Sequence, residues 1–522
     1  GRPLPKRIGL SATQRPLKAM AEFLVGDPQR GREVVSIDVP SERPLDLTIH
    51  VPSGEELSAV ASTQWWDQLL DDIAAEARKH RSTILFVNTR KLAERTAFRL
   101  AERLSSDTVA VHHGSLSMAG RQSAEQRLRE GQLRILVATA SLELGIDVGH
   151  VDLVFQIASP RSLSGFVQRV GRSGHGVGRT RRGWLLPTTR DELLECAALV
   201  RAVRKGEVDR IEIPRGTLDV LAQQIVAMCA EESRNEDDLF ALVRSTVSFA
   251  DLSRDDFESV VKMLCEGLET PRGIRGRLLH RNGLEGTVRG RRGAHLTVTT
   301  CGGTIAELGE YRVILEPAEL AIGTVHEDWA IESSPGDIFS LGSRSLQVRR
   351  VENGTVRVVD AGGAPPTFPF WIAEAPARTD DLSAAVSFLR ADLMADMQAG
   401  RDPTPWLMDE CALSAPVADQ LVHYAKAQWE AVGVIPSQAQ ILVERFFDEA
   451  GGQQLVVHAP FGARINRGLG LSLRKRFCRA FNQELQAAGT DDAVVLSLGN
   501  PQTFPLSEFP SFLSENTIED VL

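Results

Sequence analysis

The sequence is short of the residues that indicate a metal centre or a disulfide framework. Six cysteines occur among 522 residues, and none stands in a C-x-x-C pair. Such scattered cysteines argue against zinc and against disulfides, and they suit a reducing cytoplasm. No apolar run approaches a membrane span, and we find no signal peptide. We therefore expect a cytoplasmic protein with no membrane partner and no metal ligands of its own.

Two motifs of nucleotide-hydrolysing sites are also missing. The chain holds no G-x-x-x-x-G-K-[ST] loop and no D-E-x-[DH] box behind an apolar strand, so a phosphate cradle and Mg²⁺ ligands are not evident. The first residue is Gly1 rather than methionine, and the chain opens in mid-pattern. Its end at Leu522 has no clear cap. We expect a fragment of a longer protein.

Arginines are concentrated in two stretches of a mildly acidic chain. The net charge is −10, with 43% apolar and 25% charged residues, as in soluble globular proteins. Seven arginines and no acid lie between 161 and 190, and seven arginines lie with one acid, Glu285, between 272 and 292. Local basic patches, rather than the net charge of the whole chain, decide whether a protein binds nucleic acid. The first stretch could instead be a flexible loop or pair with another domain; phosphate contact is the better interpretation of the second.

Helical and strand patterns alternate between residues 65 and 190, which predicts a parallel α/β sheet. Polar residues follow the strands, where ligands of such sheets bind. The stretch from 137 to 175 is the richest, with Thr139, Glu143, Gly145, Asp147, Gln168, Arg169 and Arg172.

These motifs resemble the second motor domain of superfamily 2 helicases. Residues 139–147 resemble motif V, residues 168–175 motif VI, I-L-F-V-N-T-R at 84–90 motif IV, and S-A-T at 11–13, after an expected strand at 8–10, motif III. The resemblance implies that Arg172 stabilises the γ-phosphate of ATP. Arg169 is the second candidate, or else forms a structural ion pair. His175 stands where many relatives carry an arginine, and its role stays open.

The same resemblance implies which residues contact ATP and nucleic acid. ATP would contact Asp147 through its ribose, with Gly145, Gln168 and Thr13 nearby and Mg²⁺ held mainly by an absent first motor domain. Backbone phosphates suit small donors and helix N-termini, and the candidates are Thr89, Arg90, Ser115 and Thr139. Taken singly, each serine or threonine is as well explained as a helix cap.

Two accessory modules are expected after the motor domain. Helices and an N-G hairpin predict a winged helix, in which Ser253 caps a helix and Arg289 and Arg291 contact phosphate; bracing the motor is the equal alternative. The next residues, from A-H-L-T-V-T-T at 294–300, predict a β-rich module. In it Ile305 could wedge at a strand junction and Trp371 could stack on a base, with core packing as the default for both.

The C-terminal residues narrow the resemblance. G-G-T-I at 302–305, P-F-W at 369–371 and V-E-R-F-F-D-E-A-G-G-Q-Q-L-V-V-H-A-P-F-G-A-R-I-N at 443–466 resemble the large helicase-related (Lhr) family. Two helices, two short strands and a basic helix that includes Arg464, Arg467, Arg474 and Arg479 predict a mixed α/β region. The basic face is either solvated or a wall of a DNA channel.

The expected protein is therefore a multi-domain α/β fragment. Its parts are a remnant of a first RecA-like motor domain at 1–30, a second RecA-like domain at 31–190, the winged helix at 191–293, the β-rich module at 294–372 and an Lhr-type domain at 373–522. The resemblance implies ATP-dependent 3′–5′ movement on single-stranded DNA, unwinding of DNA duplexes and RNA:DNA hybrids, and DNA repair. Alternatives are a non-catalytic nucleic-acid clamp or adaptor and an RNA-specific superfamily 2 helicase.

Overall fold

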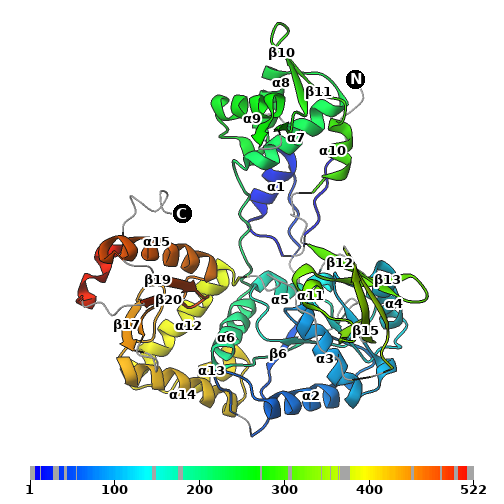
Figure 1. The fold of residues 1–522 in the computed structure, drawn as a ribbon. Helices are drawn as coiled ribbons and strands as arrows, with labels where there is room; N and C mark the ends of the chain where they lie inside the picture. The colour runs from blue at the N-terminus through cyan, green and yellow to red at the C-terminus, as the bar shows by residue number, and fades with distance from the viewer. Residues whose placement is uncertain are drawn as a thin grey trace. The chain divides into compact units, whose positions relative to one another are not determined.

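The protein was analysed as a computed structural model, which describes residues 6–11, 13–26, 34–39, 44–54, 56–143, 148–174, 180–270, 273–303, 309–342, 344–352, 354–362, 364, 377–447, 452–482, 485–498 and 504–513. The chain divides into two compact units (Figure 1). The motor unit consists of residues 41–209 and 309–522, and the winged-helix unit of residues 1–40 and 210–308. Over the described ranges, no helix is long and apolar enough to cross a membrane.

A six-stranded sheet forms the centre of the motor unit. Its strands are β1 (Leu45–Ile49), β2 (Thr83–Phe86), β3 (Val109–His112), β4 (Ile135–Ala138), β5 (Leu153–Ile157) and β6 (Arg181–Leu186). They lie in the order β1-β6-β5-β2-β4-β3, and each neighbouring pair is parallel. The predicted parallel sheet is confirmed, and β1, which precedes the alternating pattern of residues 65–190, is one of its edge strands.

Helices cover both faces of this sheet. They are α2 (Thr63–Ala77), α3 (Arg90–Arg103), α4 (Met118–Arg129), α5 (Leu163–Val170) and α6 (Arg190–Arg204). Along β2, Leu85 packs in the core cluster that includes α2 and α3, whereas Ile84 and Phe86 pack in the cluster that includes α4. Successive residues of a strand point to opposite faces. A strand covered on both faces therefore requires the uninterrupted apolar runs of the sequence.

A second sheet docks on the motor domain within the same unit. Its strands are β12 (Glu310–Leu315), β13 (Leu320–His326), β14 (Ile338–Leu341), β15 (Arg344–Glu352) and β16 (Thr355–Asp360), in the order β13-β12-β16-β15-β14. The Thr324 amide donates to the Ser115 carbonyl at 2.7 Å. A Cβ on Gly323 would lie 2.4 Å from that carbonyl oxygen, so the close approach of the two backbones requires glycine.

A buried carboxylate fixes this docking. Glu94 on α3 is fully buried. It accepts hydrogen bonds from the Gly342 amide at 2.6 Å and the Ser340 hydroxyl at 3.2 Å, both in the second sheet. His113 Nε2, after β3, lies 2.9 Å from the same carboxylate. Because a buried charge is costly without such partners, these contacts favour one position of the sheet on the motor domain.

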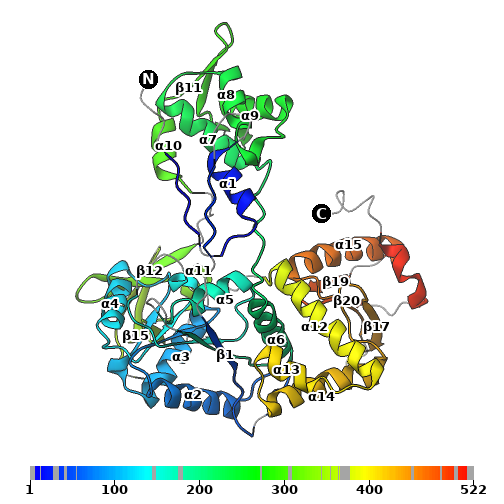
Figure 2. The same cartoon turned by 180° about the vertical axis from the view of Figure 1, so that it is seen from behind.

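The C-terminal part of the motor unit combines helices with a third sheet (Figure 2). Its helices are α12 (Asp380–Ala399), α13 (Thr404–Cys411), α14 (Ala415–Val432) and α15 (Ala463–Phe481). Its strands β17 (Leu442–Phe447), β18 (Gln453–His458), β19 (Leu485–Gly489) and β20 (Ala493–Leu498) form an antiparallel sheet in the order β17-β18-β20-β19. The expected helices and first two strands are confirmed. Helix α13 is an additional helix between α12 and α14.

Three helices and a hairpin form the core of the winged-helix unit. Helices α7 (Leu218–Glu231), α8 (Glu236–Arg244) and α9 (Arg254–Glu266) share a core with β10 (Leu279–Asn282) and β11 (Thr287–Gly290), and β7 (Arg234–Asn235) completes the small sheet. The Ser253 hydroxyl accepts from the Asp256 amide at 3.0 Å, which confirms the predicted cap. The predicted winged helix is confirmed as well.

Two expected strands are wrong. Residues 294–300 form helix α10 (Ala294–Thr300), which packs on the winged-helix core through Ala294. The hydroxyls of Thr297, Thr299 and Thr300 donate to carbonyls four residues back, so these β-branched residues are accommodated in a helix. Residues 8–10 precede helix α1 (Leu17–Val25) but join no described strand. An isolated apolar segment without a neighbouring strand cannot form ladder hydrogen bonds.

Candidate functional site

The carboxyl ends of four motor strands lie together at one edge of the sheet. Phe86, the last residue of β2, pairs with Ala138 of β4 and with Gln156 of β5, and Ala138 pairs in turn with His112 of β3. The loops after β2, β3 and β4 and the segment leading into α5 therefore start at neighbouring positions. This edge is where ligands of open parallel sheets bind. Thr89, Ser115 and Thr139 lie in the loops that follow these strands, and Arg169 lies on α5.

Arg169 on α5 is held in a buried polar network. Its guanidinium donates to Glu143 Oε2 at 3.0 Å through Nε and to Gln156 Oε1 at 2.7 Å. The residue is only 4% exposed, and its guanidinium carbon lies 5.3 Å from the centre of the Phe86 ring. Burial lowers the pKa of the Arg169 guanidinium, and Glu143 opposes that shift. The structure thus places Arg169 in the ion pair that was the alternative to a phosphate contact.

Arg172 follows α5 and is less enclosed. It is half-buried, and one guanidinium nitrogen donates to the Glu143 carbonyl at 2.7 Å. Glu143 therefore orients both arginines, Arg169 through its carboxylate and Arg172 through its backbone. Arg172 is the better placed of the two to reach a phosphate.

The remaining nucleotide candidates are placed unevenly. Gln168 is half-buried on α5, beside Arg169 in sequence. Gly145 and Asp147 lie outside the described residues, as does His175. Thr13 is buried, 7% exposed, in the winged-helix unit. The structure therefore brings Gln168, Arg169 and Arg172 together.

The strand-end hydroxyls have partners within the protein. The Thr89 hydroxyl accepts from the Leu92 amide at 3.2 Å and caps α3. Ser115 is 2% exposed, and its hydroxyl accepts from Arg90. Arg90 also pairs with Glu310 of the second sheet at 3.2 Å. Thr139 is half-buried, and its amide donates to the His112 carbonyl at 3.3 Å.

The surroundings of the strand-end hydroxyls could not be predicted from the sequence. The second sheet covers the loop that holds Ser115, so this side chain is not displayed on the surface. Thr89 does cap a helix, the alternative weighed for every strand-end hydroxyl. Thr139 remains the candidate at the strand ends with no capping bond from its side chain.

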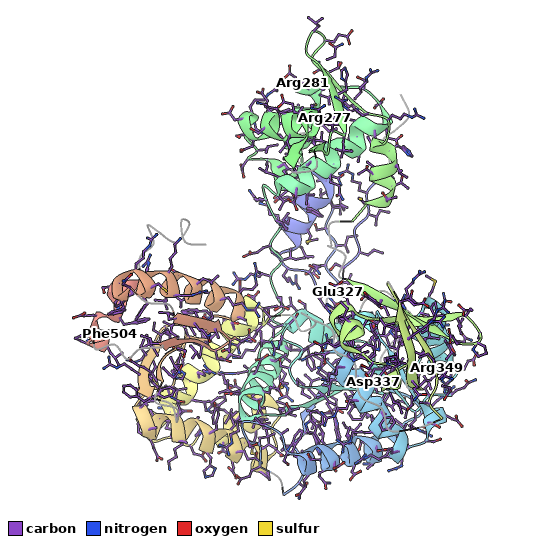
Figure 3. The ribbon with its side chains drawn as sticks, in the orientation of Figure 1. Arg277, Arg281, Glu327, Asp337, Arg349 and Phe504 are labelled. Atoms are coloured by element: carbon purple, nitrogen blue, oxygen red, sulfur yellow. The ribbon has the colours of Figure 1, made fainter. Side chains whose placement is uncertain are left out.

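Several arginines of the winged helix serve its own fold (Figure 3). Arg281 makes two hydrogen bonds of 2.6 Å with Glu236, and Arg277 donates to the Glu266 carbonyl at 2.7 Å. The predicted phosphate contact Arg291 donates to the Leu279 carbonyl at 2.6 Å. Arg289, the other prediction, is exposed on β11. The basic patch available to a ligand is thus smaller than the sequence indicates.

Ile305 and Trp371, the predicted wedge and stacking residues, lie outside the described residues. Two residues that the motifs do not single out, Gln156 and Asn88, extend the Arg169 network. Gln156 Nε2 donates to Asn88 Oδ1 at 3.4 Å, and Asn88 Nδ2 donates to the Ser159 carbonyl at 2.7 Å. Polar residues inside or directly after apolar strands were the available signal, because a buried amide requires partners.

Family models match three parts of the chain. "Helicase conserved C-terminal domain" matches residues 64–176, which include the six-stranded sheet's central strands and α5. "Large helicase-related protein, winged helix domain" matches residues 201–368, and "DEAD/H associated" matches residues 435–522. Together they follow the order of modules that the structure displays.

Individual relatives match almost the whole chain. A protein of Mycolicibacterium smegmatis named Lhr helicase/probable uracil glycosylase is 32% identical over 94% of this chain. The ATP-dependent helicase Lhr-Core of Saccharolobus solfataricus is 30% identical, again over 94% of the chain. A solved structure of helicase Lhr from Mycobacterium smegmatis, bound to single-stranded DNA and AMP-PNP, matches 97% of the chain with 31% identity and a TM-score of 0.74.

The chain belongs to the Lhr family. The match extends over the motor domain, the winged helix and the C-terminal region, as the sequence resemblance predicted. The chain spans 35% of the mycobacterial relative's length and 57% of the Saccharolobus one's. The Lhr relatives are therefore longer proteins, of which this chain corresponds to one part.

Proposed function

We propose that this chain is the second motor domain, winged helix and C-terminal region of an ATP-dependent DNA helicase. The intact protein would move 3′ to 5′ on single-stranded DNA and unwind duplexes, including RNA:DNA hybrids, in DNA repair. The observation that carries the proposal is the placement of Arg172 and Arg169 by Glu143 at the strand ends. Support comes from Lhr relatives named ATP-dependent helicases and from one solved with single-stranded DNA and AMP-PNP.

In this proposal the chain supplies one side of the ATP site. Negative charge on the γ-phosphoryl group is stabilised during transfer by an arginine from the facing domain. Arg172 has that role, and Arg169 holds α5 in place through its buried pair. The residues present suit the side of the nucleotide that faces this domain. No described group of three or more His, Cys, Asp or Glu side chains is arranged to hold a metal, so we assign Mg²⁺ ligands to none of them.

The first test is whether ATP hydrolysis needs a further domain. We expect the 522 residues alone to hydrolyse ATP at the background rate, because they hold no phosphate-binding loop. The same residues joined to a motor domain that carries the loop should show DNA-stimulated hydrolysis. Phosphate release with and without single-stranded DNA measures both. Robust hydrolysis by the 522 residues alone would refute this division of the site.

A basic face of α15 is the candidate nucleic-acid surface of the C-terminal region. One side of the helix is buried against its sheet by residues such as Leu473 and Phe477. The opposite side exposes four arginines, and the helix contains no acidic residue. They are Arg464, Arg467, Arg474 and Arg479. An acid-free row of exposed arginines suits a polyphosphate backbone better than it suits solvent alone.

We expect Arg464→Ala with Arg474→Ala to weaken single-stranded DNA binding more at low salt than at high salt. Loss of two phosphate contacts should reduce the slope of log K against log[salt] by about 1.4, roughly 0.7 for each contact with a single strand. The control is Lys79→Ala with Arg182→Ala, which removes two exposed charges near the amino ends of the strands. Equal slopes for the two variants would assign the α15 face to solvent.

Binding experiments with matched DNA and RNA strands test which type of nucleic acid the protein prefers. Competition between DNA and RNA of one sequence at stated salt separates the DNA helicase from an RNA-specific one. Unwinding of duplexes with 3′ or 5′ single-stranded tails, by the protein that carries a phosphate-binding loop, tests direction and the preference for RNA:DNA hybrids. Binding without any ATP-dependent unwinding would favour the non-catalytic clamp.

A further inference from the structure

The segment that enters α5 is held by a single carboxylate. Asp209 accepts hydrogen bonds from the Ser164 amide and the Ser162 hydroxyl, both at 2.7 Å and both to Oδ2. Ser162 itself caps α5 by accepting from the Gly165 amide at 3.0 Å. A carboxylate at this position accepts hydrogen bonds from helix amides and interacts favourably with the positive end of the helix dipole. Asp209 therefore fixes where α5 begins.

The C-terminal region reaches the same carboxylate. The Thr379 hydroxyl donates to the other oxygen of Asp209, Oδ1, at 2.6 Å. The Thr379 amide donates to the Arg161 carbonyl at 2.9 Å, and Arg161 pairs with Asp491 at 3.2 Å. Arg161 has φ 63°, in the left-handed region, a conformation that a non-glycine residue adopts when its surroundings impose it. The loop before α5 is thus shaped from the C-terminal side.

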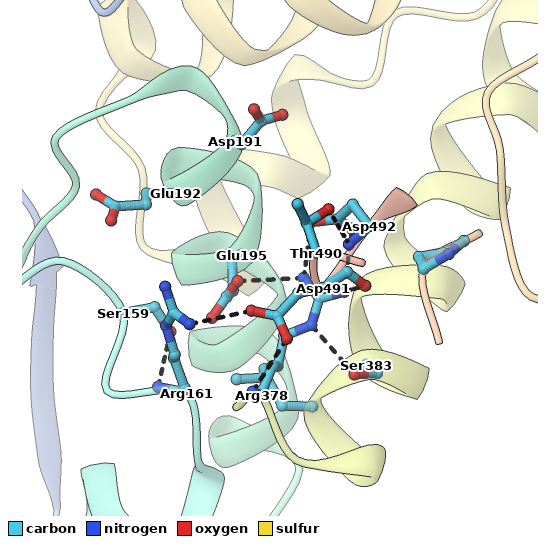
Figure 4. Close-up of polar contacts among 12 residues, drawn as sticks. Ser159, Arg161, Asp191, Glu192, Glu195, Arg378, Ser383, Thr490, Asp491 and Asp492 are labelled. Atoms are coloured by element: carbon cyan, nitrogen blue, oxygen red, sulfur yellow. Dashed lines mark hydrogen bonds and ion pairs between the residues drawn. The ribbon is translucent and has the colours of Figure 1, made fainter. Parts of the chain in front are cut away.

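A buried charge cluster holds residues 378 and 379 in place (Figure 4). Arg378, whose side chain is 1% exposed, pairs with Glu195 of α6 at 3.1 Å and with Asp492 at 3.0 Å. It also donates to the Asp491 carbonyl at 3.0 Å. Burial raises the pKa of Glu195. Burial alone would raise the pKa of Asp492 too, but Arg390 and Arg378 outweigh it and the pKa is lowered.

This cluster joins the C-terminal region to the motor domain at one defined position. Buried charge networks tolerate few alternative arrangements, because a shift leaves a charge without its partner. Helix α5 is only 8 residues long. Arg172 lies directly beyond its end, so a displacement at Ser162 is carried to Arg172 by a short rigid segment. A small displacement of a group that acts on a reacting phosphate lowers the rate strongly, since a shift of about 1 Å can reduce the rate 100-fold.

We propose that the C-terminal region positions Arg172 for ATP hydrolysis through the Thr379–Asp209 hydrogen bond. Thr379 and Asp209 are then positioning residues, and the C-terminal region contributes to hydrolysis without touching ATP. The inference rests on the proposed function, because it concerns the arginine assigned there to the γ-phosphate.

Thr379→Val tests the proposal, with Thr379→Ser as the matched control. Valine has the shape of threonine without the hydroxyl, and serine keeps the hydroxyl. Arg378 is a less suitable position for substitution, because its removal leaves buried carboxylates unpaired and destabilises the fold. In the 522-residue chain, we expect Thr379→Val to speed amide hydrogen exchange of residues 163–170 by about 10-fold to 100-fold, as for loss of a hydrogen bond to a charged group. Exchange in α2 should be unchanged.

The second measurement is ATP hydrolysis by the protein that carries a phosphate-binding loop. Thr379→Val should lower kcat by about 10-fold to 100-fold with KM for ATP and DNA affinity unchanged, and Thr379→Ser should retain kcat. Asp209→Asn should act similarly, and the double variant should be no worse than the stronger single one. A purely structural contact predicts parallel losses in all properties.

Each outcome has a distinct meaning. Faster exchange in α5 with unchanged kcat would refute positioning, and unchanged exchange would refute the mechanical link itself. An unsubstituted protein with no ATP hydrolysis would defeat the proposed function instead, whereas the exchange experiment would still report whether Thr379 holds α5.

Discussion

Arg172→Ala is expected to lower kcat for ATP by about 10³-fold to 10⁵-fold, the range for arginines that stabilise phosphoryl transfer from the facing domain. The guanidinium lies beside the strand ends, where Glu143 holds one of its nitrogens through a backbone carbonyl at 2.7 Å. Single-stranded DNA binding should be unchanged, because Arg172 is assigned to the nucleotide. The measurement is single-turnover phosphate release by the protein that carries a phosphate-binding loop, with DNA affinity measured alongside.

Two further variants sharpen this prediction. Arg172→Lys should also fail, because an ammonium cannot reproduce the planar fork of donors that the guanidinium offers. Arg95→Ala is the control, since Arg95 is an exposed arginine of α3 that stacks near Trp66. Turnover that survives Arg172→Ala would remove Arg172 from the site and leave Gln168 as the nearest remaining candidate.

Glu143→Ala is expected to destabilise the motor domain by about 3–5 kcal/mol, the cost of leaving a buried charge without its partner. Arg169 is 4% exposed and pairs with Glu143 at 2.9 Å. Among the described residues, Gln156 alone would remain as its side-chain acceptor. The expected result is a lower urea midpoint of unfolding for the 522-residue chain, followed by fluorescence and by exchange of the amides in α5. Hydrolysis should fall as well, because Arg169 loses the carboxylate that holds α5, the helix that leads into Arg172.

Further variants test whether the destabilisation by Glu143→Ala comes from the lost ion pair or from a general loss of packing. Glu143→Leu combined with Arg169→Met replaces the ion pair by apolar side chains and should recover much of the lost stability, as for other buried pairs. Glu102→Ala on the exposed face of α3 should change the unfolding free energy by no more than about 0.5 kcal/mol. If Glu143→Ala and Glu102→Ala had equal effects, the Arg169 pair would not be a buried structural element.

The sequence predicted the parallel sheet and the order of the modules well, because both depend on local patterns. Strand β2 contains the apolar run Ile84-Leu85-Phe86, and such runs belong to strands covered on both faces. The motif residues Thr139, Gln168, Arg169 and Arg172 follow strands in fixed order, so the resemblance to superfamily 2 helicases could be recognised from them. In the same way Ser253 was identified as a cap from its own neighbourhood.

Prediction failed where the outcome depends on a distant neighbour. The segment at 294–300 has β-branched residues and was expected in a strand, yet the winged-helix core binds it as a helix. Whether Ser115 is displayed depends on Gly323, which lies far along the chain and requires a backbone approach that no local pattern reveals. The sequence pattern is compatible with a phosphate contact for Arg169, but the structure pairs its guanidinium with Glu143 and Gln156.

The sequence by itself determined the fold class, the motif order and the residues from which a nucleotide site could be assembled, since periodicity and turn chemistry act over a few residues. Only the tertiary structure decided how those residues are used. Hydrogen bonds and ion pairs join groups that are remote in sequence, as Arg378 and Asp492 are, and burial sets the energetic value of each pair. For this reason Arg172 could be separated from Arg169, and the C-terminal region could be linked to the helix that carries Arg169 and leads into Arg172.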